Sequence, residues 1–181
     1  MLHVAAMTNS KICYGIEKAE LPAKYAKIME KEFIFWMNFF GKKYSNFKIY
    51  KADFAQPSPM NESVTKIINN AKLVFVNNYA FGAELNNQLK SRFCKMKENA
   101  FIISSEALCP LKSRKKSQIN SRNFEDIGAI IDLGDLGPLN GNVSWKGKLQ
   151  KFFVQRINRT LLEKYFAELK EKKLKTLVQA K

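Results

Sequence analysis

The segment from Leu73 to Gly82 reads L-V-F-V-N-N-Y-A-F-G, in which an apolar run of strand length leads into a polar turn. The apolar run, from Leu73 to Tyr79, predicts a buried strand. A short polar helix is expected before it, and helical periodicity follows it from Ala83 to Met96. Strands that alternate with helices are typical of a parallel sheet with helices packed on it.

The same alternation continues in both directions along the chain. A helix is expected from Pro22 to a stop at Gly41, and a last helix after Thr160, which has the chemistry of an N-cap. The first of these helices carries an apolar face that we expect to be core: Tyr25, Met29, Phe33, Trp36 and Phe40. Further strands are predicted at Lys11–Glu17, Phe47–Phe54, Ala100–Ser105, Ile127–Leu133 and Lys151–Asn158. The pattern favours an α/β fold with a mostly parallel sheet and helices on both faces.

Net charge points to a polyanionic partner. The 181 residues include 31 Lys and Arg against 16 Asp and Glu, which gives a formal charge of +15. An excess of this size attracts nucleic acid or an acidic protein surface. No break in composition divides the chain, so we expect one domain over residues 1–181, with a basic helical tail from about residue 167.

Cysteine, histidine and hydropathy exclude several classes of protein. The three cysteines are far apart and His3 is the only histidine, so neither a disulfide framework, a zinc site nor His-based catalysis is indicated. No apolar run reaches the roughly 18 residues of a membrane span. We therefore expect an intracellular protein that binds no metal and no membrane.

Two carboxylates, Glu17 and Asp53, end predicted strands. Parallel sheets bind ligands beyond the carboxyl ends of their strands, and a carboxylate there can accept hydrogen bonds from ribose hydroxyls. These two residues are therefore candidates for nucleotide binding. The alternative for each is an ordinary solvated carboxylate.

The chain also carries five motifs in a distinctive order: Y-G-I-E-K-A (Tyr14–Ala19), L-P-A-K-Y-A (Leu21–Ala26), F-V-N-N-Y-A-F-G (Phe75–Gly82), I-N-S-R-N (Ile119–Asn123) and V-S-W-K-G-K (Val143–Lys148). Together they resemble the Dot-type (disruptor of telomeric silencing) histone-lysine methyltransferases, from about Leu2 to Phe166. The resemblance implies a class I, Rossmann-like fold, S-adenosylmethionine as methyl donor and no metal. It also implies a nuclear protein, here expected to be a monomer, that methylates a lysine on the globular core of histone three in the nucleosome.

The resemblance assigns five residues to the donor site. Glu17 resembles the family's ribose-binding acid, while Asp53 and Phe54 stand where the adenine amine is bound and the ring covered. Phe75 resembles the residue on the other side of the adenine. Asn77 resembles the catalytic-loop asparagine near the transferred methyl group. Without the resemblance, Phe54 and Phe75 would be read as core residues.

The resemblance also implies a channel for the substrate lysine. Trp145 resembles a tryptophan that walls this channel, and Ser104 and Ser105 are expected at its border. Phe152 stands where the family usually has a tyrosine beside the acceptor amine, so one hydroxyl is lost there. Asn77, Trp145 and Phe152 are the candidate catalytic residues.

The basic residues are candidates for nucleosome docking. Arg122 resembles the family arginine that anchors the enzyme in the acidic patch of the nucleosome. Lys115 and Lys116 lie in a nearby basic loop that is expected to add a contact, with a solvated charge run as the alternative. The Lys-rich segment Lys170–Lys175 is a candidate for DNA contact or an exposed helix end.

The start of the chain departs from the family pattern. Leu2 to Ala6 resembles the helix after the family's glycine-rich donor loop, so we expect a sheet that is N-terminally truncated before its first, central strand. The segment Asp132–Gly141 (D-L-G-D-L-G-P-L-N-G) does not replace that loop, because its glycine spacing is wrong and Pro138 follows; we expect a late strand and turn. Two alternatives to the histone enzyme remain open: an inactive nucleosome-binding module and a methyltransferase of RNA or DNA.

Overall fold

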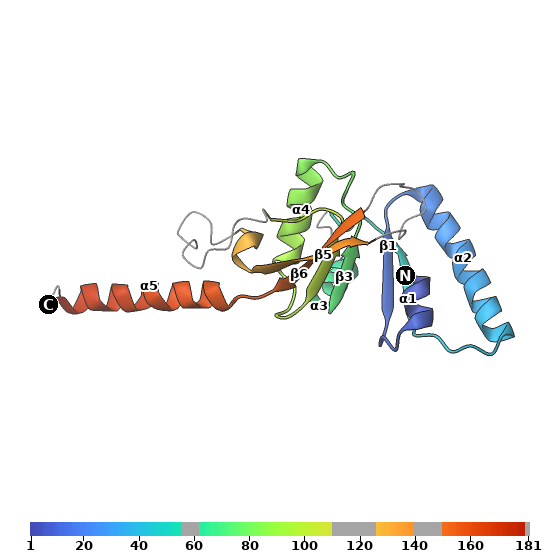
Figure 1. Cartoon of the computed structure of the whole chain (residues 1–181), viewed down its shortest axis with the longest axis horizontal. Coiled ribbons are helices and arrows are strands. Elements are labelled where there is room, and N and C mark those ends of the chain that lie inside the picture. The colour runs from blue at the N-terminus through green and yellow to red at the C-terminus, as the bar shows by residue number, and fades with distance from the viewer. Residues whose placement is uncertain (56–61, 110–125, 140–149, 180–181) are drawn as a thin grey trace. The chain divides into compact units, whose positions relative to one another are not determined.

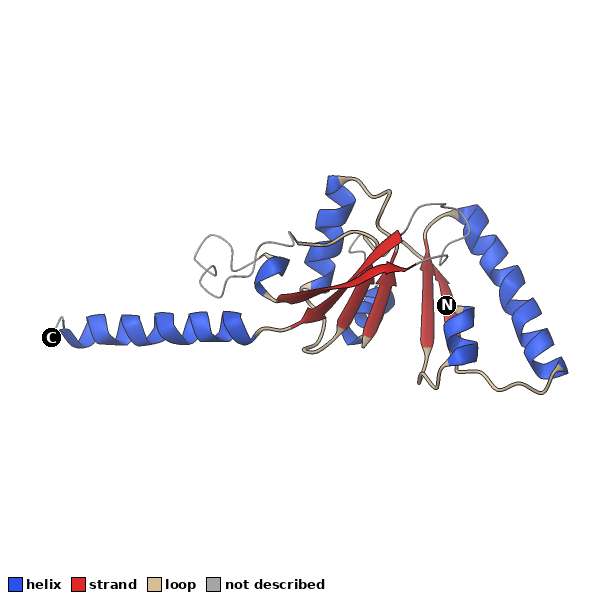
Figure 2. Cartoon of the chain, in the orientation of Figure 1, coloured by secondary structure: helices blue, strands red, loops and turns tan. Residues whose placement is uncertain are grey.

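The structure, a computed structural model, describes residues 1–55, 62–109, 126–139 and 150–179 (Figure 1). Its contacts cluster into two compact units, Met1–Ile67 and Ile68–Lys181. Both contain helices and strands (Figure 2), which confirms a mixed α/β protein. The single domain and the class I sheet stay predictions.

The first unit is built on two parallel strands. β1 (Cys13–Glu17) pairs with β2 (Phe47–Lys51), residue for residue. α1 (Leu2–Met7) precedes them, and α2 (Glu20–Phe39) makes the crossover between them. The predicted stop of α2 is confirmed: Gly41 has φ +61°, and the N–H groups of Gly41 and Lys42 donate to the carbonyls of Asn38 and Met37.

The prediction that the apolar face of α2 is core is wrong in this structure. Tyr25, Met29, Trp36 and Phe40 are each about half exposed or more, and only Phe33 packs, its ring 5.5 Å from that of Phe47. A two-stranded sheet is too narrow to cover a helix of 20 residues. At the end of α2 the side chains contact one another instead, with ring centroids of Trp36 and Phe40 5.8 Å apart.

The second unit is built on a four-stranded mixed sheet. The strand order is β3-β4-β6-β5, with β3 (Leu73–Val76) parallel to β4 (Phe101–Ser104) and β6 (Gln150–Ile157) antiparallel to β4 and β5 (Ile131–Leu139). The expected parallel pairing therefore holds for β1 with β2 and for β3 with β4 only. The helices are α3 (Glu62–Asn70), which crosses the boundary between the units, α4 (Ala83–Phe93), a short 3-10 helix, η2 (Ile127–Ala129), and α5 (Thr160–Gln179).

The two faces of this sheet differ in burial. One face points into the core, where Ile102, Ser104, Gln155 and Ile157 are fully buried. On the opposite face Phe75 remains 64% exposed and Phe101 40%. β3 is the end strand of the sheet, and among the described residues β1 pairs with β2 alone. The missing central strand is not tested by this arrangement and stays a prediction.

Several predicted elements are longer than those observed: β2 ends at Lys51 instead of Phe54, and β3 at Val76 instead of Tyr79. Two further differences have local reasons. The strand expected from Ile127 begins at Ile131, because the Asp126 carboxylate accepts from Gly128 N–H (2.7 Å) and caps η2. Asp132–Leu139 then lies in β5, as expected for a late strand. α5 begins at Thr160 itself, and Asn158 caps it by accepting from the Thr160 N–H (3.1 Å).

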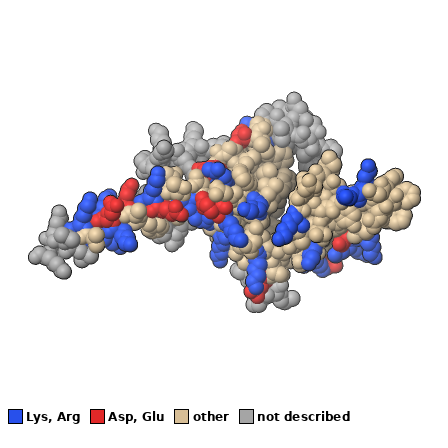
Figure 3. Space-filling model, turned by 90° about the horizontal axis from the view of Figure 1, so that it is seen from below, with Lys and Arg blue, Asp and Glu red and all other residues tan. Residues whose placement is uncertain are grey.

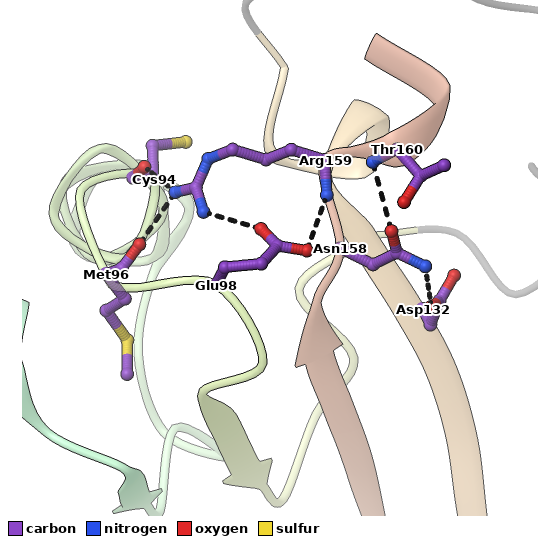
Figure 4. A network of polar contacts seen from close by, with 7 residues as sticks. All are labelled: Cys94, Met96, Glu98, Asp132, Asn158, Arg159 and Thr160. Carbon is purple, nitrogen blue, oxygen red and sulfur yellow. Dashed lines mark hydrogen bonds and ion pairs between the residues drawn. The ribbon is translucent and has the colours of Figure 1, made fainter. Parts of the chain in front are cut away.

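The first turn of α5 is anchored by Arg159 (Figure 4). Its guanidinium donates to the carbonyls of Cys94 (2.9 Å) and Met96 (2.7 Å) and pairs with Glu98 (3.0 Å), whose carboxylate also accepts from the Arg159 N–H (3.1 Å). Next to it, Asn158 donates to the Asp132 carboxylate. Four hydrogen bonds from one residue therefore tie the start of α5 to the turn after α4.

Replacing Arg159 by Met is expected to lower the free energy of unfolding by about 1–3 kcal/mol, because it leaves two part-buried carbonyls without their donor and removes the ion pair with Glu98. Urea denaturation followed by circular dichroism measures the change. Lys164→Met, an exposed position on the same helix, serves as the control and should change stability by less than about 0.5 kcal/mol. Equal stabilities of the two variants would contradict the anchor.

Cys94, half-buried beside this anchor, has a perturbed thiol. Burial raises its pKa, the Asp126 carboxylate raises it further, and Arg159 lowers it. The unfolded chain therefore loses this proton at a lower pH than the folded chain. Above the ordinary thiol pKa the unfolded state binds fewer protons, so the free energy of unfolding falls as pH rises.

Cys94→Ala is expected to lose less stability than the wild type between about pH 8 and pH 10, where thiols ionise. Thermal unfolding across that range measures the stability of both proteins, which share the other two cysteines, Cys13 and Cys109. Parallel stability profiles would show that the Cys94 thiol ionises normally.

Candidate functional site

In the first unit the carboxyl ends of both strands carry the predicted acids. Glu17 is the last residue of β1, and the Ala52 N–H donates to its carbonyl (2.9 Å), which extends the parallel ladder by one bond. Asp53 follows one residue later. Because the strands are parallel and in register, Glu17 and Asp53 lie at the same edge of this sheet. The structure therefore brings these two candidates together.

Hydrogen bonds hold both carboxylates in place. Glu17 Oε1 accepts from the Ala19 N–H (2.8 Å), just before α2. Asp53 Oδ1 accepts from the Ala55 N–H (2.9 Å), and its Oδ2 pairs with Lys18 Nζ (2.8 Å). The Asp53 side chain is 17% exposed, whereas that of Lys18 is 69% exposed. The turn after each strand thus fixes an oriented carboxylate, and Phe54 follows Asp53 directly.

In the second unit Phe75 lies on the open face of the sheet. It occupies β3, and its ring centroid is 5.8 Å from that of Phe152 on β6. The register places Phe75 beside Ile103 and Ile103 beside Val154, so Phe152 lies diagonally across the same face. An exposed ring next to a half-buried one forms an apolar surface on which a flat ring could stack.

Asn77 follows β3 and is exposed. Its Oδ1 accepts a hydrogen bond from the Ser105 hydroxyl (2.8 Å) at the end of β4. Ser105 N–H donates to the Val76 carbonyl (3.3 Å), so the backbones of the two strand ends are also joined. Asn77 therefore lies at the carboxyl edge of the two parallel strands of this unit, as expected for a ligand-binding residue.

Behind Asn77 lies a buried polar network that was not predicted from the sequence. Asn78, 1% exposed, donates to Asn86 Oδ1 (3.1 Å) and the Glu106 carbonyl (3.2 Å), and accepts from the Glu106 N–H (2.9 Å). Both the NH₂ group and the oxygen of its side-chain amide are therefore used. Asn86 in turn donates to the Phe81 carbonyl (3.1 Å), which fixes the turn between β3 and α4.

Gln155 extends this network from β6. It is fully buried, donates to the Ser104 hydroxyl (2.6 Å) and accepts from the Leu108 N–H (3.0 Å). The Ser104 hydroxyl donates to the Glu106 carbonyl (2.7 Å), so both of its contacts are internal. The sequence carried one signal for this network: Gln155 is a polar residue at an inward-facing position of an apolar strand, between Phe153 and Ile157.

The structure places the predicted residues in two groups. Glu17, Asp53 and Phe54 belong to the first unit, and Phe75, Asn77 and Phe152 belong to the second. Four candidates lie outside the described residues: Trp145, Arg122, Lys115 and Lys116. Their roles stay predictions.

Lys and Arg side chains are spread over the face seen in Figure 3, with acidic side chains between them along α5. Within residues 1–55, 62–109, 126–139 and 150–179, no three His, Cys, Asp or Glu side chains are grouped as metal ligands would be. Of the helices described there, none has the length and apolar character needed to cross a membrane.

The sequence profile of one protein family, described as "Histone methylation protein DOT1", matches residues 1–157. A Drosophila melanogaster protein named histone-lysine N-methyltransferase, H3 lysine-79 specific, is 40% identical over 172 residues, 95% of this chain and 9% of that protein. Proteins of the same name from Caenorhabditis elegans and Cryptococcus neoformans are 28% and 27% identical, over 91% and 92% of this chain and 17% and 25% of theirs. The chain therefore spans a quarter or less of the length of these relatives.

Proposed function

The chain belongs to the DOT1 histone methylation family, and we propose that it transfers a methyl group from S-adenosylmethionine to a lysine on the globular core of histone three in the nucleosome. The observation that carries the proposal is the match of the family over residues 1–157 together with 40% identity to a protein named as an H3 lysine-79 methyltransferase. We further propose that both units form one class I methyltransferase domain.

The donor site is proposed to combine the two groups of residues. Glu17 would accept hydrogen bonds from the ribose hydroxyls, and Asp53 would accept one from the adenine amine. Phe54 and Phe75 would enclose the adenine, since a flat ring gains both apolar burial and stacking between two aromatic side chains. In support, Glu17 and Asp53 share one strand edge, and Phe75 is 64% exposed beside its strand end.

The reaction is a direct displacement. The lone pair of the lysine Nζ attacks the methyl carbon, the carbon–sulfur bond breaks, and its electron pair turns the sulfonium into a neutral thioether. The lysine ammonium gives up one proton to solvent before the attack, and the product is the methylated ammonium. The protein mainly has to align the two reactants, so neither a covalent nucleophile nor a histidine is needed.

The lysine must arrive uncharged. With a pKa of about 10.4, neutralising it at pH 7 costs roughly 4–5 kcal/mol in water. A channel lined by aromatic side chains would lower the pKa by desolvation, and the cationic donor would lower it further. Phe152, on the open face of the second unit, is proposed to line this channel with Trp145. Phenylalanine supplies the apolar wall but no hydroxyl for the amine.

Docking on the nucleosome is assigned to basic residues. Arg122 is proposed to bind carboxylates of the acidic patch, because a planar guanidinium contacts them bidentately. Lys115 and Lys116 would add contacts to the same surface or to DNA. The formal charge of +15 supports a polyanionic partner. We place the protein in the nucleus, as a monomer on its substrate.

Arg122→Ala is expected to weaken nucleosome binding roughly tenfold or more, since a hydrogen bond to a charged group contributes about 1.5–3 kcal/mol. Arg122→Lys keeps the charge but loses the bidentate geometry, so an intermediate affinity is expected. Electrophoretic mobility shift on recombinant nucleosomes measures all three proteins. Lys95→Ala, which removes one exposed positive charge, is the control. If Arg122→Ala binds as tightly as Lys95→Ala, the docking role is wrong.

A methyl-transfer assay tests the function itself. The full chain is incubated with tritiated S-adenosylmethionine and recombinant nucleosomes, with Asp53→Ala as the inactive variant. Label in histone three, absent with the variant, is expected. Label in RNA or DNA alone, or no label with the wild-type chain, would overturn the proposal.

A further inference from the structure

The amide of Asn77 is engaged on one side only. Its Oδ1 accepts from the Ser105 hydroxyl at 2.8 Å. In the part of the chain that the structure describes, its Nδ2 donates to nothing, although the residue is exposed at the edge of the sheet. The two ends of this amide are chemically opposite, so their assignment determines which ligand group Asn77 can bind.

The distances around Ser105 favour one direction for this hydrogen bond, from the Ser105 hydroxyl to Asn77 Oδ1. Ser105 is 6% exposed and lies between two amide oxygens, Asn77 Oδ1 at 2.8 Å and Asn78 Oδ1 at 3.3 Å. Asn78 cannot turn its oxygen away, because the Glu106 N–H, which can only donate, already binds that oxygen at 2.9 Å. The one hydroxyl proton of Ser105 can therefore be donated to either amide oxygen, and the shorter contact, to Asn77 Oδ1, is the stronger.

We propose that Ser105 is a positioning residue for Asn77: its hydroxyl holds Asn77 Oδ1, so that the Asn77 amide presents its NH₂ group to the ligand. The inference rests on the proposed function and refines it. An outward NH₂ group binds a hydrogen-bond acceptor and not a donor. On S-adenosylmethionine the strong acceptor at the polar end is the carboxylate, whereas its ammonium can only donate. Asn77 therefore selects the carboxylate.

NMR of the ¹⁵N-labelled full chain tests the positioning role without any ligand. The Asn77 side-chain amide signals are identified as the pair missing from Asn77→Asp. Ser105→Ala, which is smaller than serine and so fits the site, should shift this pair because the amide oxygen loses its donor. Ser104→Ala is the matched control, since the Ser104 hydroxyl contacts Glu106 and Gln155 but not Asn77.

The comparison has three outcomes. A shift with Ser105→Ala alone supports the proposal. A shift with both variants indicates general loosening of the strand ends, and a shift with neither indicates no hydrogen bond; either result overturns the positioning role.

Calorimetric titration with S-adenosylmethionine tests the choice of ligand group. Ser105→Ala should bind about three- to tenfold more weakly than the wild type, because the Asn77 amide loses the hydrogen bond that orients it. The affinity of Ser91→Ala, on the exposed side of α4, should stay within about twofold of the wild type. Asn77→Asp keeps the shape but turns a donor into an anion, so it should bind more weakly than Asn77→Ala. If Asn77→Asp binds as well as the wild type, the carboxylate assignment is wrong.

A wild-type chain that binds no S-adenosylmethionine would overturn the proposed function and, with it, the carboxylate assignment. The ligand-free NMR comparison would still decide the positioning role, so the two failures are distinguishable.

Discussion

Replacing Gln155 by Leu is expected to lower the free energy of unfolding by about 2–4 kcal/mol. The substitution leaves the Leu108 N–H without its acceptor and removes the donor to the Ser104 hydroxyl, and both groups lie in the core. Each buried polar group left without a partner costs about 1–3 kcal/mol, more than the buried leucine side chain returns. Urea denaturation measures the difference, provided that the slope with denaturant is unchanged.

Gln88→Leu on α4 is the matched control. Its Nε2 makes a 3.4 Å contact with Glu84 at the surface, so the same chemical change should alter stability by less than about 0.5 kcal/mol. Because Gln155 also holds Ser104 and the segment behind Asn77, its variant should additionally disturb the amide signals of Asn78. Equal stability of the two variants would show that the buried network does not support this strand end.

Glu17→Ala is expected to weaken binding of S-adenosylmethionine roughly tenfold to a hundredfold. Ribose hydroxyls that donate to a carboxylate make hydrogen bonds to a charged group, which contribute about 1.5–3 kcal/mol. The variant also loses the Glu17 contact with the Ala19 N–H, so its stability must be measured alongside. The affinity of Glu17→Gln, which keeps the acceptor oxygen but not the charge, should fall between those of Glu17→Ala and the wild type.

Glu20→Ala provides the control for charge. Glu20 is three residues away, is 80% exposed and pairs with Lys51, so its removal changes net charge by the same amount while the printed contacts of Glu17 and Asp53 are kept. The affinity of Glu20→Ala for S-adenosylmethionine should match that of the wild type. If Glu17→Ala and Glu20→Ala bind equally well, Glu17 is an ordinary solvated carboxylate.

Local features of the fold could be predicted because each depends on neighbouring residues. Gly41 ends α2 because a left-handed residue was needed there, and Glu17 and Asp53 fall at strand ends because the apolar runs end before them. For Asp132–Gly141 the glycine spacing excluded a donor loop and the resemblance implied a late strand and turn; Asp132–Leu139 lies in β5, and the remaining two residues lie outside the described ranges.

Features that depend on distant parts of the chain could not be predicted. Periodicity shows that one side of α2 is apolar, but not whether the rest of the fold supplies enough surface to cover it, and Trp36 and Phe40 are exposed. Asn77 and Asn78 are adjacent residues of the same type, yet Asn78 is buried and Asn77 is exposed. Their difference arises from Ser105 and Glu106, which are far along the chain and adjacent only after β3 and β4 pair.

We propose above all that five residues make one donor site: Glu17, Asp53, Phe54, Phe75 and Asn77. Isothermal titration of the 181-residue chain with S-adenosylmethionine tests it directly. We predict one molecule bound per chain with micromolar affinity, lost in the double variant Glu17→Ala, Asn77→Ala. No measurable binding by a folded wild-type chain, or equal binding by the folded double variant, would contradict it.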